Sequence, residues 1–430
     1  MDRKEAEDYI YSSYVAAEPL LDYDAPDSEK RSPDILRDLL ISLSDAPCTV
    51  VTGSKGKGSV CCMLSALLSR RMAVGMMTSP HISSFNERIR VDGIPIDDHD
   101  LIACTEAVRP CIDGIEVPPG RYISPIGIQA AVALTHFRGR TGFNVLECGK
   151  GAAYDDVPRI PHRYAVVNTV FLEHTRELGP ALTDIAEDKS HVITEGTECL
   201  FTAEQRPEVM EIISRRAERF GTRVMSYGRD FSASGIRLSP EGTSFTAEIG
   251  DRRIEGLRIP LLGEHMARNA VLAIAHAISI VPDLTNDEIR EALAEVRWPG
   301  RTEMVSQSPL TIVDACINRE SCQETVRIVR ELISNRPTVI IGIPDDKDFL
   351  GVAETASGIA GRIILTRSSD PHYRFTDAQQ TVLEEHGIDA ESTSSLEEAL
   401  ALADVISPIL ILGTTSLVSD AESVFTARQT

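Results

Sequence analysis

The segment Gly53-Ser-Lys-Gly-Lys-Gly-Ser59 constrains this chain more than any other part of its sequence. It follows Cys48–Thr52, a short apolar run rich in β-branched residues, and it precedes Val60–Met72, where apolar residues recur at helical spacing. Glycines let backbone N–H groups approach an anion, and the N-terminus of a following helix adds partial positive charge. A strand, a glycine loop and a helix in this order predict an α/β domain that binds phosphate groups.

The loop also carries side chains suited to a nucleotide. Lys57 is placed to reach the β- and γ-phosphates, and the hydroxyl of Ser59 is placed to hold Mg²⁺. The spacing differs from the general G-x-x-x-x-G-K-[ST] pattern, because Gly58 separates Lys57 from Ser59. A glycine-rich turn without a ligand is the alternative, in which Lys55 and Lys57 would repel each other.

Strands and helices alternate along the rest of the chain, which predicts an α/β fold with a mainly parallel sheet and a smaller Rossmann-like α/β domain at the C-terminus. The predicted strands are Val74–Met77, Phe143–Leu146, Tyr164–Thr169, Leu310–Val313, Thr338–Ile341, Arg362–Leu365 and Ile409–Leu412. The predicted helices are Pro33–Leu43, Ile126–His136, Leu182–Ile193, Pro207–Phe220, Met266–Ile280 and Asn286–Val296. Residues about 230–260 alternate around turns, which indicates inserted antiparallel hairpins. Pro299 and Gly300 break the pattern, so we place a domain boundary near residue 302, between domains 1–302 and 303–430.

Composition excludes several classes of protein. The 430 residues carry a net charge of −22, which disfavours general nucleic-acid binding. No apolar stretch reaches the roughly 18 residues of a membrane span, and the charged N-terminus lacks a signal-peptide core. The nine cysteines form no Cys-x-x-Cys pair, so we expect a reduced, cytoplasmic protein.

A family resemblance explains the unusual loop. The loop resembles the G-T-N-G-K-G-S loop of the folylpolyglutamate synthase and dihydrofolate synthase family, within the Mur ligase superfamily. Residues 78–93 read TSPHISSFNERIRVDG and are similar to the family's T-S-P-H-L-x-x-F-x-E-R-I-R-V-x-G signature. Further islands match in family order: Leu146–Gly149, Glu173-His174, Ile185–Lys189, Gly263–His265, Asn269-Ala270, Trp298–Arg301, Asp346–Asp348 and Thr415–Leu417. The resemblance thus spans residues 33 to 418 and implies the P-loop-containing central domain of a Mur ligase.

The resemblance implies an ATP-dependent, ADP-forming ligase with ATP and Mg²⁺ as cofactors. Such an enzyme activates a carboxylate as an acyl phosphate and joins it to an amino acid, here L-glutamate onto a folate or related pterin. The family is commonly monomeric, so we expect a monomer without nucleic-acid or membrane partners. Two alternatives remain: a Mur-type ligase for a different carboxylate, and a nucleotide-binding scaffold without ligase activity.

The resemblance also assigns site residues. The implied catalytic residues are Lys57, Glu147, His174 and Lys189. One Mg²⁺ is expected at Ser59, Ser79 and Glu147, and a second at Glu147, His174 and Lys189. The implied nucleotide-binding residues are Gly53, Ser54, Lys55, Gly56, Lys57, Gly58, Ser59, Asn269, Arg301 and Asp314. The implied substrate-binding residues are Pro80, His81, Arg88 and Asp155.

Three of these site residues also have a purely structural interpretation. An ammonium repels Mg²⁺, so the family role of Lys189 implies carbamylation by CO₂; otherwise Lys189 is a surface lysine paired with Glu187 or Glu195. Otherwise, His174 is a core histidine and Glu147 caps a helix.

Three departures from the family pattern concern the acyl and amino-acid sides. The D-G-A-H-N-P motif reads Asp314–Arg319, with Ile317 at the histidine position. The G-L-G-G-R-L-D-A-T-N run retains Asp155 but has Ala153, Val157 and Pro158 at the Arg, Thr and Asn positions. An aromatic-Glu run near the pterin reads Ser124–Gly127. Loss of an aromatic platform and of polar partners weakens binding of a flat pterin.

Overall fold

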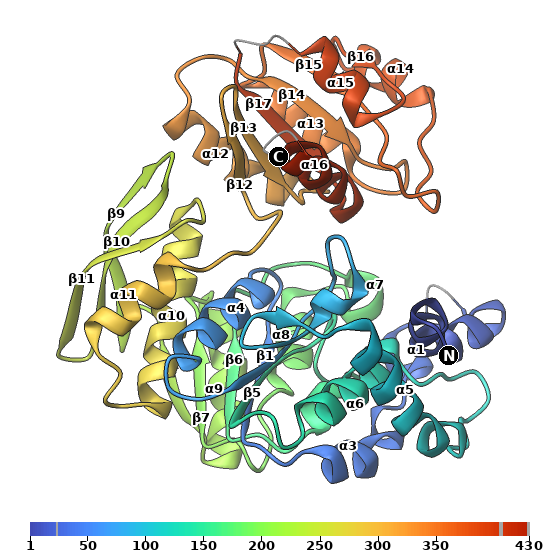
Figure 1. Ribbon diagram of the computed structural model, residues 1–430, viewed down its shortest axis with the longest axis vertical. Helices are drawn as coiled ribbons and strands as arrows, with labels where there is room; N and C mark the ends of the chain where they lie inside the picture. Colours follow the sequence, from blue (N-terminus) through green and yellow to red (C-terminus); the bar gives the residue numbers. More distant parts are fainter. Residues whose placement is uncertain (23–24, 404–406, 428–430) are drawn as a thin grey trace. The chain divides into compact units, whose positions relative to one another are not determined.

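The computed structural model describes residues 1–22, 25–403 and 407–427 of the chain, which form two compact units. The first unit comprises Met1–Ser234, Thr246–Leu257 and Arg268–Ala294. The second comprises Gly235–Phe245, Arg258–Ala267 and Glu295–Thr430. Each unit is built on its own sheet (Figure 1).

The first unit holds an eight-stranded sheet in the order β4-β3-β2-β5-β1-β6-β7-β8. Its strands are β1 (Cys48–Thr52), β2 (Val74–Met77), β3 (Ile89–Val91), β4 (Ile94–Pro95), β5 (Phe143–Glu147), β6 (Tyr164–Val167), β7 (Cys199–Thr202) and β8 (Arg223–Ser226). The pairings from β2 to β8 are parallel, whereas β3 pairs antiparallel with β2 and with β4. The central strands β1 and β5 are buried along their whole length, as expected for a parallel sheet covered on both faces.

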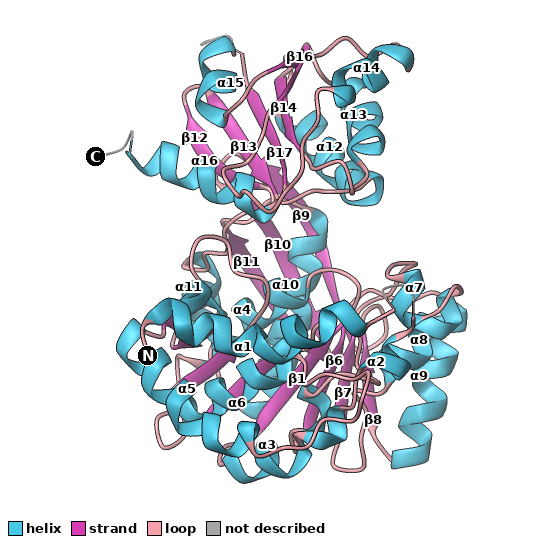
Figure 2. Cartoon of the chain, turned by 90° about the vertical axis from the view of Figure 1, so that its right-hand side faces the viewer, coloured by secondary structure: helices cyan, strands magenta, loops and turns pink. Residues whose placement is uncertain are grey.

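Helices enclose this sheet (Figure 2). They are α1 (Arg3–Ala17), α2 (Asp27–Lys30), α3 (Arg37–Leu43), α4 (Lys57–Leu68), α5 (Asp98–Asp113), α6 (Pro125–Phe137), α7 (Thr175–Leu178), α8 (Leu182–Ser190), α9 (Pro207–Phe220) and α11 (Asn286–Ala294). Helix α4 packs on β1, β2 and β5 and is contacted by α11. Helix α6 packs on β2, and helices α1, α3 and α5 pack on α6. Short 3₁₀ turns lie at Glu18–Leu20, Pro33–Ile35, Phe85–Arg88 and Val157–Arg159.

The second unit holds a six-stranded sheet in the order β12-β13-β17-β14-β15-β16. Its strands are β12 (Glu303–Gln307), β13 (Leu310–Asp314), β14 (Thr338–Gly342), β15 (Arg362–Leu365), β16 (Glu391–Ser392) and β17 (Ile409–Gly413). All pairings are parallel except β12 with β13. Its helices are α12 (Arg319–Leu332), α13 (Phe349–Ser357), α14 (Ala378–Glu385), α15 (Leu396–Leu402) and α16 (Thr415–Ala427).

Two elements contribute residues to both units. A three-stranded sheet contains β9 (Phe231–Ser239), β10 (Gly242–Ile249) and β11 (Arg252–Ile259), and helix α10 spans Glu264–Ile280. No helix within the described residues is long and apolar enough to cross a membrane.

The structure bears out the predicted α/β fold class, but the N-terminal region differs from our expectation. The predicted helix Pro33–Leu43 is a 3₁₀ turn at Pro33–Ile35 followed by α3. The sequence pattern also missed α1, because only Ala6 and Ile10 of that helix are buried. Two buried positions are too few to reveal a helical period.

Candidate active site

The phosphate-binding loop follows β1, and its backbone requires glycine at two positions. Gly53 has φ +142° and Gly56 has φ +77°, both in the region that favours glycine. A Cβ at Gly53 would lie 2.9 Å from Cβ of Asn168, and one at Gly56 would lie 2.5 Å from Nδ2 of Asn168. Helix α4 begins directly at Lys57, whose Nζ donates to the carbonyl of Gly53 at 3.0 Å. Both the backbone conformation and the available space therefore favour glycine at positions 53 and 56.

The remaining loop residues are held or exposed in different ways. The backbone N–H of Ser54 donates to the carbonyl of Thr169 at 2.9 Å, and its hydroxyl donates to the carbonyl of Phe171 at 3.1 Å. Lys55 is exposed, and Gly58 lies in the first turn of α4. The loop thus presents a lysine and the N-terminus of a 12-residue helix at the end of β1.

Polar groups collect at the carboxyl ends of four adjacent strands, β2, β5, β1 and β6. Ser79 follows β2, Glu147 ends β5, and Asn168 follows β6. Glu147 is 3% exposed, and its Oε2 accepts from the backbone N–H of Ser79 at 3.0 Å. Ser59, in the first turn of α4, is also buried. Parallel strands place their ligand sites at this edge, so the predicted metal-binding oxygens lie at a suitable position.

Lys189 is buried in α8, with 0% of its surface exposed. Its Nζ lies 2.7 Å from the carbonyl of Lys150, 3.3 Å from the carbonyl of Gly53 and 3.0 Å from Oε1 of Glu173. Burial lowers the pKa of the Lys189 amine, the nearby Lys57 lowers it further, and Glu173 raises it. The interpretation of Lys189 as a surface lysine is therefore wrong.

His174 lies beside this lysine but is not a core residue. It has φ +47° at the start of α7, and its side chain is 40% exposed. Its Nε2 lies 3.8 Å from Oε2 of Glu173, the carboxylate that also contacts Lys189. Our site assignment omitted Glu173, although the Glu173-His174 island pointed to it. The interpretation of His174 as a buried core histidine is also wrong.

Asn168 is a second residue that the sequence analysis missed. Its Nδ2 donates to Oδ1 of Asn269, on α10, at 3.0 Å, and both side chains lie against Gly56. The available signal was its position directly after the buried, β-branched strand β6. The predicted nucleotide residue Asn269 therefore adjoins the phosphate-binding loop through Asn168.

The predicted substrate residues His81 and Arg88 form one cluster, next to the cis peptide Ser79–Pro80. Nε of Arg88 donates to Nδ1 of His81 at 2.8 Å, and Nη1 donates to Oε1 of Gln129 at 3.1 Å. Burial and the adjacent Arg88 lower the pKa of His81 to about 4. His81 is therefore neutral near pH 7, with its Nδ1 engaged as an acceptor.

The predicted substrate residue Asp155 is fully buried and serves the loop that contains it. Its two oxygens accept from the backbone N–H groups of Gly149 and Val157, both at 2.9 Å. Nη2 of Arg31 lies 3.8 Å from Asp155 and 3.6 Å from Asp156, and Nη1 lies 3.6 Å from Asp27. Asp156 also accepts from the hydroxyl of Ser124. A buried arginine thus joins the N-terminal segment to the departing loop 149–158, and Asp156 links that loop to Ser124 in a second departing region.

The other predicted nucleotide residues belong to the second unit. Nη1 of Arg301 lies 3.5 Å from the carbonyl of Gly300. Asp314 ends β13, and its Oδ2 accepts from the hydroxyls of Thr302 at 2.5 Å and Thr325 at 3.1 Å. Ile317, at the departed histidine position, is half-buried.

Residues 51–277 match the family model of the Mur ligase middle domain. The folylpolyglutamate synthase of Lacticaseibacillus casei is 31% identical over 379 residues, which cover 86% of this chain and 87% of that protein. The chain belongs to the folylpolyglutamate synthase family.

Solved structures of folylpolyglutamate synthases agree. The Mycobacterium tuberculosis folylpolyglutamate synthase complexed with ADP aligns with a TM-score of 0.84 and 25% identity, covering 97% of this chain and 99% of that one. A complex of a folylpolyglutamate synthase with AMPPCP and folate aligns with a TM-score of 0.79 and 28% identity, covering 99% and 100%. These findings confirm the predicted family, fold class and ligase activity.

Proposed function

We propose that this folylpolyglutamate synthase family member uses ATP to join L-glutamate to a folate or closely related pterin. The observation that carries the proposal is the glycine-rich loop after β1, with Lys57 at its end. It lies beside buried Lys189, whose Nζ is 3.3 Å from the carbonyl of Gly53, and beside β5, which ends in buried Glu147. The carboxylate of the pterin substrate attacks the γ-phosphate and displaces ADP. The amine of glutamate then attacks the acyl phosphate, and phosphate leaves.

In the first step a carboxylate approaches a polyanion, so fixed positive charge must offset the repulsion. The backbone N–H groups around Gly56 and the start of α4 receive the phosphates, and Lys57 exchanges its carbonyl partner for a phosphate oxygen. The side chains of Asn168 and Asn269 keep the turn closed beneath the phosphates.

The donor set at this edge fits Mg²⁺. A hydroxyl from Ser59 and a carboxylate from Glu147 are hard oxygen ligands, which this cation prefers, and both residues are buried. Mg²⁺ bound there supplies charge neutralisation and polarises the γ-phosphate. The backbone N–H of Ser79 orients the carboxylate of Glu147 toward its role as a ligand.

Lys189 fits the proposed carbamate. The lowered pKa increases the fraction of neutral amine, which attacks CO₂ to form an N–C bond and releases a proton. The resulting anion would face Glu173 and the carbonyls of Lys150 and Gly53, which are all oxygen acceptors. The carbamate and these oxygen atoms would repel one another unless a cation lay among them, which agrees with a second Mg²⁺ near His174 and Lys189.

The experiment that tests this function is ADP release by the purified full chain with Mg²⁺, ATP, L-glutamate and a folate. ADP formation that depends on both the folate and glutamate, with a product heavier by one glutamyl residue, is the expected result. Release of ADP with an unrelated carboxylate, and none with any folate, would instead support the Mur-type alternative. The relatives that cover most of the chain are folylpolyglutamate synthases, so the folate interpretation is better supported.

A further inference from the structure

A cavity of about 690 Å³ lies in the first unit, on the sheet edge opposite the phosphate-binding loop. Its lining includes residues that precede three parallel strands: Pro47 before β1, His162 and Arg163 before β6, and Gly196 before β7. The phosphate-binding loop lies at the carboxyl ends of the same strands. The cavity therefore lies at the opposite strand ends from the phosphate-binding loop, although Pro158 at the end of loop 149–158 contributes to its lining. Its volume is typical of small-molecule pockets.

The walls of the cavity are held in place by the protein itself. His162 is 3% exposed, and its Nδ1 and Nε2 lie 2.7 Å from the carbonyls of Ile160 and Val192 respectively. This ring joins the loop before β6 to the end of the α8 region. Nε of Arg159 donates to Asp34 at 3.0 Å, which joins the same loop to the turn before α3. The pocket is thus formed in advance of any ligand.

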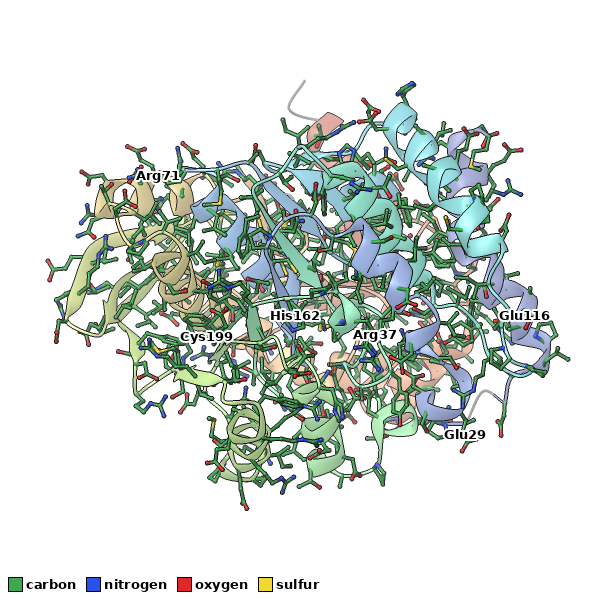
Figure 3. The ribbon with its side chains drawn as sticks, turned by 90° about the horizontal axis from the view of Figure 1, so that it is seen from below. Glu29, Arg37, Arg71, Glu116, His162 and Cys199 are labelled. Atoms are coloured by element: carbon green, nitrogen blue, oxygen red, sulfur yellow. The ribbon has the colours of Figure 1, made fainter. Side chains whose placement is uncertain are left out.

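The lining combines an apolar surface with guanidinium groups. Ile41, Pro47, Pro158, Ile160 and Pro161 supply the apolar part. Arg159 is paired with Asp34, and Arg163 forms two contacts with Glu198, at 2.7 and 2.8 Å. Arg37 lies in the first turn of α3, is exposed, and makes no ion pair with any described residue. Figure 3 shows Arg37 and His162 close together on the lower face of the molecule.

We propose that this cavity binds a small organic anion with an apolar body, whose carboxylate or phosphate is held by Arg37. The proline and isoleucine surface removes the apolar body from water. The planar guanidinium of Arg37 matches a carboxylate or phosphate with two parallel hydrogen bonds. The lining holds three arginines and two acids, of which Asp34 is ion-paired with Arg159 at 3.0 Å and Glu195 is exposed. This site lies outside the proposed ligation chemistry and does not depend on it.

Isothermal titration calorimetry of the full chain with 2-naphthoate tests the proposal, with 2-naphthamide as the neutral analogue of the same shape. We expect 2-naphthoate to bind at least tenfold more tightly than 2-naphthamide. Arg37→Glu should weaken 2-naphthoate binding at least tenfold, and Ile41→Asp should weaken both compounds. The matched control is Arg109→Glu, the same charge change at an arginine of α5 that is 52% exposed, and it should leave binding unchanged.

Four results would overturn the proposal. Three of them are equal binding of the amide, unchanged binding in Arg37→Glu, and no binding of 2-naphthoate up to 10 mM. Saturation with AMPPCP and folate should not displace 2-naphthoate, and displacement would assign the compound to the active site instead. Because the readout is heat of binding, failure here is distinct from failure of the ligation assay.

Discussion

Two loops that follow neighbouring strands of the large sheet are held in their conformations in different ways. The loop after β1 retains the family pattern, and Gly53 and Gly56 there have no space for a side chain. The loop after β5, residues 149–158, departs from the pattern and is held by Asp155 and Arg31. Backbone geometry admits one residue type, whereas side-chain packing admits many compensated solutions. The loop after β1 therefore tolerates fewer substitutions than the loop after β5.

The largest expected effect is at the phosphate side. Lys57→Ala removes a fixed cation at the phosphates and should lower the rate of ADP formation about 1,000-fold. Steady-state ADP release by the full chain measures this effect. Lys4→Ala, which removes an exposed lysine of α1, is the control and should retain activity. A Lys57→Ala enzyme with more than a tenth of the normal rate would contradict the assigned role of the loop.

The second-largest expected effect is a loss of folding stability when the support of the loop after β5 is removed. Arg31→Ala leaves three buried carboxylates without their counter-charge and should lower the free energy of unfolding by about 3–5 kcal/mol. Urea unfolding followed by circular dichroism measures the change. Removing an exposed arginine with the Arg109→Ala variant should cost less than about 1 kcal/mol. If the two variants lose similar stability, Arg31 does not hold this loop.

Lys189→Ala tests the proposed carbamate at the phosphate side. The variant should lose about 100-fold in the rate of ADP formation, because an anionic metal ligand is missing. Short carboxylic acids such as acetate should restore part of the rate by supplying a carboxylate in the emptied space, whereas bicarbonate should not. Full activity of Lys189→Ala would refute the carbamate role.

The smallest expected effect is a pH dependence of stability that comes from Asp156, in the loop after β5. Burial raises the pKa of Asp156 to about 6, from an ordinary value of 3.8. A raised carboxyl pKa stabilises the folded state below pH 3.8, and this contribution is lost as the pH rises through 6. Asp156→Asn should therefore stabilise the protein by about 2–3 kcal/mol at pH 7 and by almost nothing at pH 3.5. Urea unfolding at the two pH values checks this, and equal shifts at both would exclude the titration.

The order of motifs along the sequence was enough to predict the α/β fold class and the ligase family. The position of β1 followed from a continuous apolar run, which is typical of a buried parallel strand. The position of α4 followed from apolar residues at helical spacing. Helix α1 escaped notice because its buried face is too narrow to leave a pattern.

Some residues of the candidate site were predicted from the sequence, and others are recognised only in the structure. Lys57 and Glu147 were predicted from motifs, and the structure places them at adjacent strand ends. Glu173 and Asn168 were not predicted to be functional, because their roles depend on which side chains they contact across the sheet edge. A single sequence does not report such contacts.

The sequence by itself determined the phosphate-binding loop, since its glycines are required by backbone conformation within a few residues. Only the tertiary structure decided that Lys189 is buried against Glu173, that Asp155 supports its own loop, and that Arg31 joins the N-terminal segment to that loop. Charge pairs and burial depend on residues far apart in the chain, and the low dielectric that shifts the pKa of Lys189 exists only after folding.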